Sequence, residues 1–365
     1  MAYLTISSNF VQWFEHDGIQ PFQLLNNLQP LNLKMHPYAI IDLGTNTFNL
    51  LVFEQRADGI RVLHSEEVPV FLGKDGIEKG MLADAAIQRG LAALQVLKER
   101  ANEHGATSCK GFGTSALRNA KNAEALIVPA GDIGIHISVI PGEEEAELIL
   151  AGVRQAVRFT GKPALVMDIG GGSIEFILAT EKALMWKHSF ELGVTRLRER
   201  IPISEPITVD QEARIAAHLD DRLEPLYAII ERHEPHVLIG SAGSFDTLAA
   251  IVSASRDQPL DPNALTRKMA ADYADGADSR DQPFSPDVLT LPFSAMEFDA
   301  ISDRLLRMDR EERMCVPGLP EHRVDTLPYA LIAIERVLTA GAIRDLAWSK
   351  YALKEGAAFR MMQTF

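Results

Sequence analysis

A short pattern that occurs twice constrains the fold of this chain more than any other feature. Residues 38–53 and residues 164–179 can be aligned without a gap. In each copy an apolar run ends at an aspartate, Asp42 or Asp168, a glycine-containing turn with a hydroxyl side chain follows, and a second apolar run leads away. Short apolar runs bounded by turn residues are typical of buried strands. The sequence therefore predicts the same strand, turn, strand unit twice.

Patterned segments around the two units predict an α/β protein. Apolar residues at helical spacing predict helices over residues 82–104, 143–157 and 209–233, and short apolar runs predict strands over 108–112, 135–140 and 236–239. Residues 255–290 are expected to be loop with some helix around 265–273, and the chain from 294 onward is expected to be mostly helical.

Two such units imply two similar domains whose acidic turns face one another across a cleft. We place these domains at residues 37–160 and 161–344, with a C-terminal helix over about 345–365 that could return to the first domain. Residues 1–36 are rich in Asn and Gln and have no clear periodicity, so we treat them as a poorly structured N-terminal extension. A docking arm built on the aromatic residues of this segment is the alternative.

Composition excludes several classes of function. The chain has 365 residues, and its 36 Lys and Arg against 50 Asp and Glu give a net charge of −14 with no basic block, which argues against nucleic-acid binding. No apolar run is long enough to cross a bilayer. Two cysteines, Cys109 and Cys315, are too few for a disulfide scaffold and too isolated for a zinc site. We expect a cytoplasmic protein that binds neither nucleic acid nor membrane.

The two aspartates are candidate metal ligands. An ionised carboxylate at the end of a buried strand is costly unless a partner offsets its desolvation, and a cation shared by Asp42 and Asp168 would do so. Mg²⁺ prefers one or two carboxylates together with water and phosphate oxygens. Alternatively, each Asp only caps its own turn through backbone amides. Glu175, which interrupts the apolar run 174–179, is either a further ligand for metal or water or an exposed carboxylate on an edge strand.

Two glycine-rich segments are candidate phosphate loops, because small residues leave backbone amides open to an anion. The first loop comprises Gly170, Gly171, Gly172 and Ser173. The second loop precedes a predicted helix, whose positive end favours anions, and comprises Gly240, Ser241, Gly243 and Ser244. Arg118, one turn into a predicted helix, is either a clamp for phosphate oxygens or an ordinary surface arginine.

Glu145 is the candidate general base. It is the third of three acids that begin a predicted helix, where acids need no function because they complement the helix dipole. Among the three, Glu145 lies at the margin of the apolar face, one turn before Ile149. A partly desolvated carboxylate with a raised pKa could take a proton from water that attacks a phosphoanhydride.

Five motifs, in this order, resemble those of the exopolyphosphatase and guanosine pentaphosphate phosphohydrolase (Ppx/GppA) family. They are residues 42–48, 113–118, 140–146, 168–175 and 240–244, and the resemblance extends over about residues 37–356. It implies the duplicated α/β fold of the actin, Hsp70 and sugar-kinase type, in which two ribonuclease-H-like domains enclose an interdomain cleft.

The resemblance also implies roles for individual residues. Glu145 matches the general base, Arg118 and the glycine loops match phosphate-binding groups, and Asp168 and Glu175 match acids associated with Mg²⁺, for which Mn²⁺ is a possible substitute. The first turn matches a phosphate and metal loop that comprises Asp42, Gly44, Thr45, Asn46 and Thr47. The chain resembles the short form of the family, which argues against high processivity, and a homodimer is a further expectation. Asp246 departs from the family because a neutral residue is expected there.

These residues support a metal-dependent hydrolase that releases terminal orthophosphate from polyphosphate by direct attack of water. One alternative is a hydrolase that converts guanosine pentaphosphate (pppGpp) to ppGpp, and another is a regulator that binds nucleotide or phosphate without catalysis. A polyanionic substrate requires a locally positive groove in a chain of net charge −14. The candidates for this groove are Arg118, Lys121, Arg196 and Arg198.

Overall fold

The computed structural model describes residues 36–56, 59–257 and 289–362. Residues from Pro37 onward form one compact unit. The predicted N-terminal extension, apart from its last residue, and the helix predicted around 265–273 lie outside the described residues.

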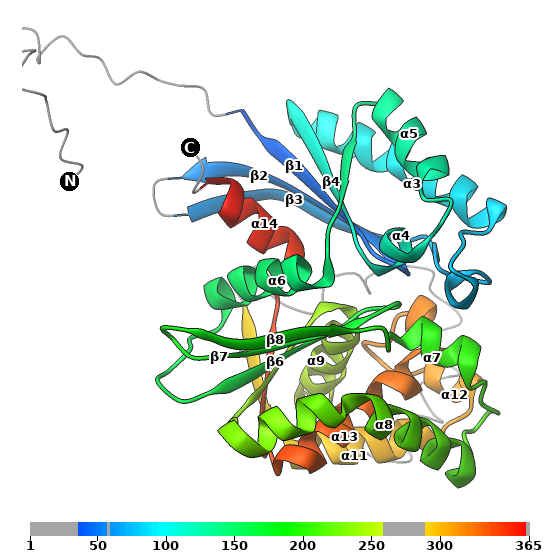
Figure 1. The fold of residues 1–365 in the computed structure, drawn as a ribbon, viewed down its shortest axis with the longest axis vertical. Helices are drawn as coiled ribbons and strands as arrows, with labels where there is room; N and C mark the ends of the chain where they lie inside the picture. Colours follow the sequence, from blue (N-terminus) through cyan, green and yellow to red (C-terminus); the bar gives the residue numbers. More distant parts are fainter. Residues whose placement is uncertain (1–35, 57–58, 258–288, 363–365) are drawn as a thin grey trace, which may run out of the picture. The chain divides into compact units, whose positions relative to one another are not determined.

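The first duplicated unit forms part of a five-stranded sheet (Figure 1). Its strand order is β3-β2-β1-β4-β5, in which β1, β2 and β3 are antiparallel and β4 and β5 run parallel to β1. The strands are β1 (Tyr38–Leu43), β2 (Thr47–Arg56), β3 (Gly59–Pro69), β4 (Ser108–Gly113) and β5 (His136–Val139). The associated helices are η2 (Ile77–Lys79), α3 (Asp84–Glu103), α4 (Ser115–Asn119), α5 (Glu124–Asp132) and α6 (Gly142–Ala156).

The second unit forms a six-stranded sheet with the same topology. Strands β6, β7 and β8 are antiparallel, β9 and β11 run parallel to β6, and β10 is added at the edge of β11. The strands are β6 (Ala164–Ile169), β7 (Ile174–Ala179), β8 (Leu184–Phe190), β9 (Leu238–Ser241), β10 (Thr290–Ser294) and β11 (Asp345–Ser349). The helices are α7 (Val194–Arg200), α8 (Val209–His233), α9 (Ala242–Asp257), α11 (Ala295–Arg307), α12 (Arg310–Met314), η3 (Glu321–Arg323), α13 (Leu327–Gly341) and α14 (Leu353–Met362).

This repeated order of three antiparallel and two further parallel strands is the ribonuclease-H-like topology, so the predicted fold of the actin, Hsp70 and sugar-kinase type is confirmed. The duplication extends to the register of the strands. Asp42 lies opposite Asn49, and Asp168 lies opposite Glu175. The turns are closed by equivalent hydrogen bonds of 3.0 Å, in which Gly44 N donates to the Thr47 carbonyl and Gly170 N donates to the Ser173 carbonyl.

Helices α6 and α14 lie between the two sheets (Figure 1). One apolar cluster joins them to Ile40 and Leu51 of the first sheet and to Val166 and Ile177 of the second. The outer face of the first sheet packs against α3 and α5, and the second sheet has a separate core with α8, α11 and α13. The C-terminal helix α14 therefore packs against the first sheet as well as α6, although it follows the last strand of the second sheet.

Two glycines allow α6 and α14 to cross with their backbones in contact. A Cβ atom on Gly356 would lie 1.7 Å from the Leu148 carbonyl oxygen, and one on Gly152 would lie 2.1 Å from the Ala352 carbonyl oxygen. Only a residue without a side chain permits this approach. The crossing fixes the first turn of α14 beside α6, and the same turn borders the cleft described below.

Most predicted elements are present with boundaries that differ by a few residues, and α8 begins and ends as predicted. The prediction of a mostly helical chain after residue 294 is wrong over Asp345–Ser349, which forms β11. This strand is only five residues long and is stabilised by pairing with β9 and β10, which are distant in sequence. Its local pattern is therefore too short to distinguish it from the helices around it.

Candidate active site

The tips of the two duplicated turns meet at a cavity between the sheets. A Cβ atom on Gly171 would lie 2.9 Å from Thr45 Cβ, and one on Gly172 would lie 2.5 Å from Ser115 Oγ. The first turn is also joined to α7 of the second half by a hydrogen bond of 2.6 Å, which Thr195 Oγ1 donates to Asn46 Oδ1. The two acidic turns therefore face one cleft, as expected, and their tips are in direct contact.

Predicted site residues from both halves of the protein line this cavity. They are Asp42, Gly44, Thr45, Asn46, Thr47, Glu145, Asp168, Gly170, Gly171, Gly172, Ser173, Gly243 and Ser244. Four predicted residues, Arg118, Glu175, Gly240 and Ser241, are not among its lining residues. Gly240 instead makes room for the ring of Phe245, since a Cβ there would lie 1.8 Å from Cδ1 of that ring.

Asp42 and Asp168 end equivalent strands and lie close enough to influence each other's ionisation. Burial, together with the negative charge of Asp168, raises the pKa of Asp42 from 3.8 to about 7. Burial also raises the pKa of Asp168 to about 6, although a 2.6 Å hydrogen bond from Ser241 Oγ opposes the rise. Ser241, predicted as a phosphate donor, thus bonds to Asp168 in this structure.

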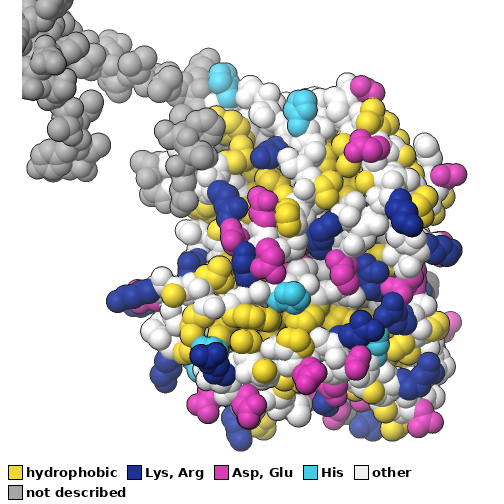
Figure 2. Space-filling view, viewed as in Figure 1, with side chains coloured by type: hydrophobic (Ala, Val, Ile, Leu, Met, Phe, Trp, Pro, Cys, Tyr) yellow, Lys and Arg dark blue, Asp and Glu magenta, His cyan; other side chains and the backbone are white. Residues whose placement is uncertain are grey.

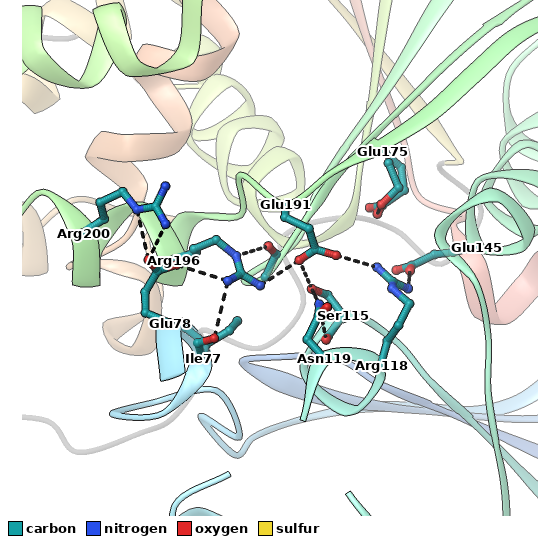
Figure 3. A network of polar contacts seen from close by, with 12 residues as sticks. Ile77, Glu78, Ser115, Arg118, Asn119, Glu145, Glu175, Glu191, Arg196 and Arg200 are labelled. Carbon is teal, nitrogen blue, oxygen red and sulfur yellow. Dashed lines mark hydrogen bonds and ion pairs between the residues drawn. The ribbon is translucent and has the colours of Figure 1, made fainter. Parts of the chain in front are cut away.

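Glu145 lies in the first turn of α6 and faces the cavity, whereas Glu143 in the same turn is exposed. Its side chain is paired with Arg118, whose Nη1 lies 2.7 Å from Glu145 Oε2 (Figure 3). Arg118 Nη1 also donates to the Ile140 carbonyl oxygen at 3.1 Å, which fixes the guanidinium beside α6. Burial raises the pKa of Glu145 to about 8 against the opposing effect of Arg118.

Glu175 is on β7, between β6 and β8, and is 1 % exposed. The alternative of an exposed carboxylate on an edge strand is therefore wrong. Ser189 Oγ donates to Glu175 Oε1 at 2.6 Å. Burial and the nearby negative charges of Glu145 and Asp168 raise the pKa of Glu175 well above its ordinary value. Although Glu175 does not line the cavity, its charge contributes to the electrostatics of the acids that do.

Comparison with known proteins identifies the family of this chain. Residues 51–365 match the model of the Ppx/GppA phosphatase family. The chain belongs to this family. It is accordingly a phosphate-releasing hydrolase that acts on phosphoanhydrides, and the predicted family is confirmed.

Three known proteins illustrate how far the similarity extends. Exopolyphosphatase 2 of Mycobacterium tuberculosis is 26% identical over 337 residues, which cover 88% of this chain and 98% of that protein. An exopolyphosphatase from Cytophaga hutchinsonii, known from its crystal structure, is 33% identical with a TM-score of 0.79, and the match covers 90% of this chain and 98% of that one. The crystal structure of the Aquifex aeolicus family member has a TM-score of 0.69 at 20% identity and shares the fold.

The structure also places basic residues at the Ppx/GppA cleft that the sequence analysis did not select. Lys354, in the first turn of α14, is held by an ion pair of 3.0 Å with Glu355. Burial opposes its charge, but Glu355, Asp246 and Asp42 together raise the pKa of Lys354. The sequence predicted a C-terminal helix that could return to the first domain, but it did not predict that Lys354 would line the cleft.

Another ion pair does cross the cleft, and its acid lies on β3. Arg323 Nη2 lies 2.5 Å from Glu67 Oε2, and His322 Nε2 lies 3.0 Å from Glu67 Oε1. Burial alone would raise the pKa of Glu67, but Arg323 and His322 outweigh it and lower this pKa to about 2. Asp246, the departure from the family pattern, lines the same side of the cavity and accepts a 2.7 Å hydrogen bond from Trp348 Nε1.

The cleft carboxylates fit a hard divalent cation. Asp42 Oδ1 is buried and has no hydrogen-bond partner among the described residues. A bound cation would stabilise such an oxygen beside the negative charge of Asp168. No group of three or more His, Cys, Asp or Glu side chains in the described part of the chain is arranged to hold a metal ion by itself. Water and phosphate oxygens would therefore have to complete the coordination shell, as Mg²⁺ prefers.

No helix in the part of the chain that the structure describes is long and apolar enough to span a membrane.

Proposed function

We propose that this enzyme releases terminal orthophosphate from inorganic polyphosphate by direct attack of water on the outermost phosphorus. The observation that carries the proposal is the position of Glu145, a buried acid at the cleft that is paired with a guanidinium. The Mycobacterium and Cytophaga relatives are both named exopolyphosphatases, which supports polyphosphate as the substrate class.

In this mechanism Glu145 takes the proton of the attacking water at its carboxylate. A pKa of about 8 suits this task because a base works best when its pKa is near the operating pH. Arg118 would orient the carboxylate and stabilise negative charge on the phosphoryl oxygens, since a planar guanidinium can donate paired hydrogen bonds to carboxylate or phosphate. The reaction needs no covalent intermediate with the protein.

The two turns would hold the terminal phosphate group. The tip residues Thr45, Asn46, Gly171 and Gly172 line the cavity, and their small or polar side chains leave room for an anion. Gly44 N and Gly170 N are already used inside the turns, so these two glycines would act by shaping the turns. Gly243 and Ser244 would contact phosphate at the start of α9, where the helix end favours negative charge.

Asp42 and Asp168 would hold Mg²⁺ or Mn²⁺, with Glu175 adding negative charge behind them. The cation would offset the charge that develops on the phosphate oxygens. Asp42 and Asp168 would then remain ionised at neutral pH, because a neighbouring cation lowers the pKa of a carboxylate.

The lining of the cavity favours polyphosphate over pppGpp. None of the described residues that line it is Phe, Tyr or Trp. A guanine base is commonly held by stacking on an aromatic ring, whereas a polyphosphate chain requires only groups that bind phosphate. We therefore place pppGpp second.

The test is phosphate release from polyphosphates of defined length and from pppGpp, measured side by side with and without divalent metal. The proposal expects metal-dependent release with a higher kcat/KM for polyphosphate. Faster release from pppGpp would assign the second function. If wild type releases phosphate from neither substrate faster than the Glu145→Gln variant does, the protein binds its ligand without catalysis.

A further inference from the structure

Glu191, in the segment that follows β8, lies at the centre of a cluster of polar contacts that joins the two halves of the protein (Figure 3). Ser115 Oγ donates to Glu191 Oε2 at 2.8 Å, and Arg196 Nη2 lies 2.7 Å from the same oxygen. Arg118 Nη2 lies 3.4 Å from Glu191 Oε1. One carboxylate is therefore surrounded by a hydroxyl group and two guanidinium groups.

The groups that donate to Glu191 are held in place by other contacts. Arg118 is fixed by Glu145 and by the Ile140 carbonyl oxygen. Arg196 donates to the Gly172 carbonyl oxygen at 3.2 Å and pairs with Glu78 at 3.1 Å. Because these anchors do not involve Glu191, the positions of the two guanidinium groups do not depend on its carboxylate.

Exposure differs between the donors and the acceptor. The side chains of Arg118 and Arg196 are 18% and 13% exposed, whereas that of Glu191 is 41% exposed. Because the carboxylate of Glu191 is partly exposed, water can solvate it once it leaves its partners, which lowers the cost of displacing it. The donors remain partly buried and directed at the same place.

The donor set matches a phosphate group. Arg and Ser side chains that converge on one point bind carboxylate and phosphate oxygens in the same way, and phosphate carries more charge and more acceptor oxygens. The position is also continuous with the cleft, because Ser115 lines the cavity and contacts Gly172 of the second turn.

We propose that Ser115, Arg118 and Arg196 form a phosphate subsite for the substrate chain, and that Glu191 occupies this subsite until a phosphate group displaces it. The proposal rests on the function proposed above. It makes Glu191 a residue that determines affinity: its carboxylate competes with the substrate and weakens binding of short anions more than binding of long chains, which have other phosphate groups to hold them.

The surface charge agrees with this assignment. On the face seen in Figure 2, basic and acidic side chains alternate where α4 and α7 lie, so no uninterrupted basic groove is present there. Three of the four basic residues predicted to form a groove are paired with acids of the chain itself: Arg118 with Glu145 and Glu191, Arg196 with Glu78 and Glu191, and Arg198 with Asp325. A polyphosphate chain must displace such acids in order to bind, and Glu191 is the acid that contacts both Arg196 and the predicted phosphate ligand Arg118.

The test compares Glu191→Gln with Glu199→Gln. Gln at position 191 keeps the hydrogen bond from Ser115 but no longer attracts the two guanidinium groups. Glu199 is the matched control. Glu199→Gln also removes one negative charge, and Glu199, which lies on α7, accepts a 2.8 Å hydrogen bond from Asp75 N across the same interface but outside the proposed subsite. Two quantities are measured for each enzyme: the KM for polyphosphate, and the dissociation constant of inorganic phosphate by calorimetry.

We expect Glu191→Gln to lower the dissociation constant of inorganic phosphate by about three- to tenfold, and the KM for polyphosphate by a smaller factor, because a competing carboxylate with partly exposed contacts is removed. Glu199→Gln should match wild type. A KM that rises, or a kcat that falls without tighter phosphate binding, would show that Glu191 only positions Arg118 and would overturn the proposal. Unchanged phosphate affinity would overturn it as well.

Inorganic phosphate binding separates this inference from the proposed function. If wild type does not hydrolyse polyphosphate but Glu191→Gln binds phosphate more tightly, the proposed substrate is wrong and the subsite stands. If wild type hydrolyses polyphosphate and Glu191→Gln binds phosphate no more tightly than Glu199→Gln, the function stands and the subsite is wrong.

Discussion

Replacing Glu145 by Gln separates the chemistry of this carboxylate from its effect on stability. Glu145 is 7% exposed, and burial raises its pKa from 4.5 to about 8 even with Arg118 beside it. At about 1.36 kcal/mol per pH unit, the ionised carboxylate destabilises the fold by up to about 5 kcal/mol above pH 8. Glutamine has nearly the same shape and no charge, so the substitution removes this unfavourable contribution.

Part of this gain in the free energy of unfolding is lost because the 2.7 Å ion pair between Arg118 and Glu145 is absent from the variant. Leaving a buried polar group with fewer partners costs about 1 to 3 kcal/mol. We therefore expect Glu145→Gln to raise the free energy of unfolding by about 2 kcal/mol at pH 8 to 9, or the Tm by about 3 to 6 °C. Turnover on polyphosphate should fall by about 10²- to 10⁴-fold, because the attacking water loses its base.

The gain in stability should depend on pH. Because the pKa of Glu145 is higher in the folded protein than in the unfolded chain, the folded protein binds the extra proton between about pH 4.5 and 8. Wild type should therefore lose stability relative to the variant as pH rises through this range, and the two should be most alike near pH 5. Calorimetric unfolding at pH 5, 7 and 8.5 with a chelator present measures this difference, and phosphate release with Mg²⁺ measures turnover.

Glu144→Gln is the matched control. Glu144 lies in the same turn of α6, its side chain is 45% exposed, and its ion pair with Arg360 is 3.8 Å long. We expect normal turnover and a Tm within about 1 °C of wild type. If Glu145→Gln keeps more than a tenth of the wild-type turnover, Glu145 is not the base. If it loses activity and stability together, the role of Glu145 is structural and our electrostatic argument fails.

Three further predictions concern the cross-cleft ion pair, the metal and the helix crossing. The pKa of Glu67 is about 2, below its ordinary value of 4.5. The contribution of Glu67 to stability should therefore be fully present above pH 4.5 and lost as pH falls towards 2. Since the Glu67 side chain is 29% exposed, this contribution is about 1 to 2 kcal/mol. Denaturant unfolding of Glu67→Gln and wild type should therefore differ at pH 7 and converge near pH 2, and a constant difference would contradict the argument. Chelation of divalent metal should abolish phosphate release, and added Mg²⁺ or Mn²⁺ should restore it. Asp42→Asn should weaken Mg²⁺ binding, measured by calorimetry, by about tenfold or more, which corresponds to at least about 1.4 kcal/mol. An unchanged Mg²⁺ affinity would remove Asp42 from the metal site. Gly356→Ala should destabilise the protein by about 3 kcal/mol or more, because the new Cβ would lie 1.7 Å from the Leu148 carbonyl oxygen. Gly131→Ala in α5, where a Cβ meets nothing within 4 Å, should instead stabilise the protein by about 0.5 to 1 kcal/mol, and equal effects of the two substitutions on Tm would show that the crossing tolerates a side chain.

Local patterns determined the parts of the fold that depend on neighbours in sequence. The apolar runs before Asp42 and Asp168 predicted both strands, and the turn residues after them predicted the same strand, turn, strand unit in both copies. Helical periodicity selected Glu145 as the acid that points inward, because its position relative to Ile149 fixes the face on which it lies. These features follow from the geometry of one strand or one helix.

The pairing of distant segments determined the rest. β11 and the first turn of α14 acquire their roles only when the chain returns to β9 and α6 from about one hundred or more residues away. Ser241 and Gly240 were expected to bind phosphate from their sequence context, but in the structure they contact Asp168 and Phe245. A sequence pattern shows which residues are able to bind an anion, but not which of them another side chain already engages.

The sequence by itself determined that two equivalent acidic turns exist and that one glutamate, Glu145, faces inward, because strand and helix periodicity act over a few residues. Only the tertiary structure decided that Arg118 would reach Glu145 and that Glu191 would lie among Ser115, Arg118 and Arg196. Ion pairs depend on distances in space between residues that lie far apart in the chain, and those distances are set by the packing of both sheets around α6 and α14.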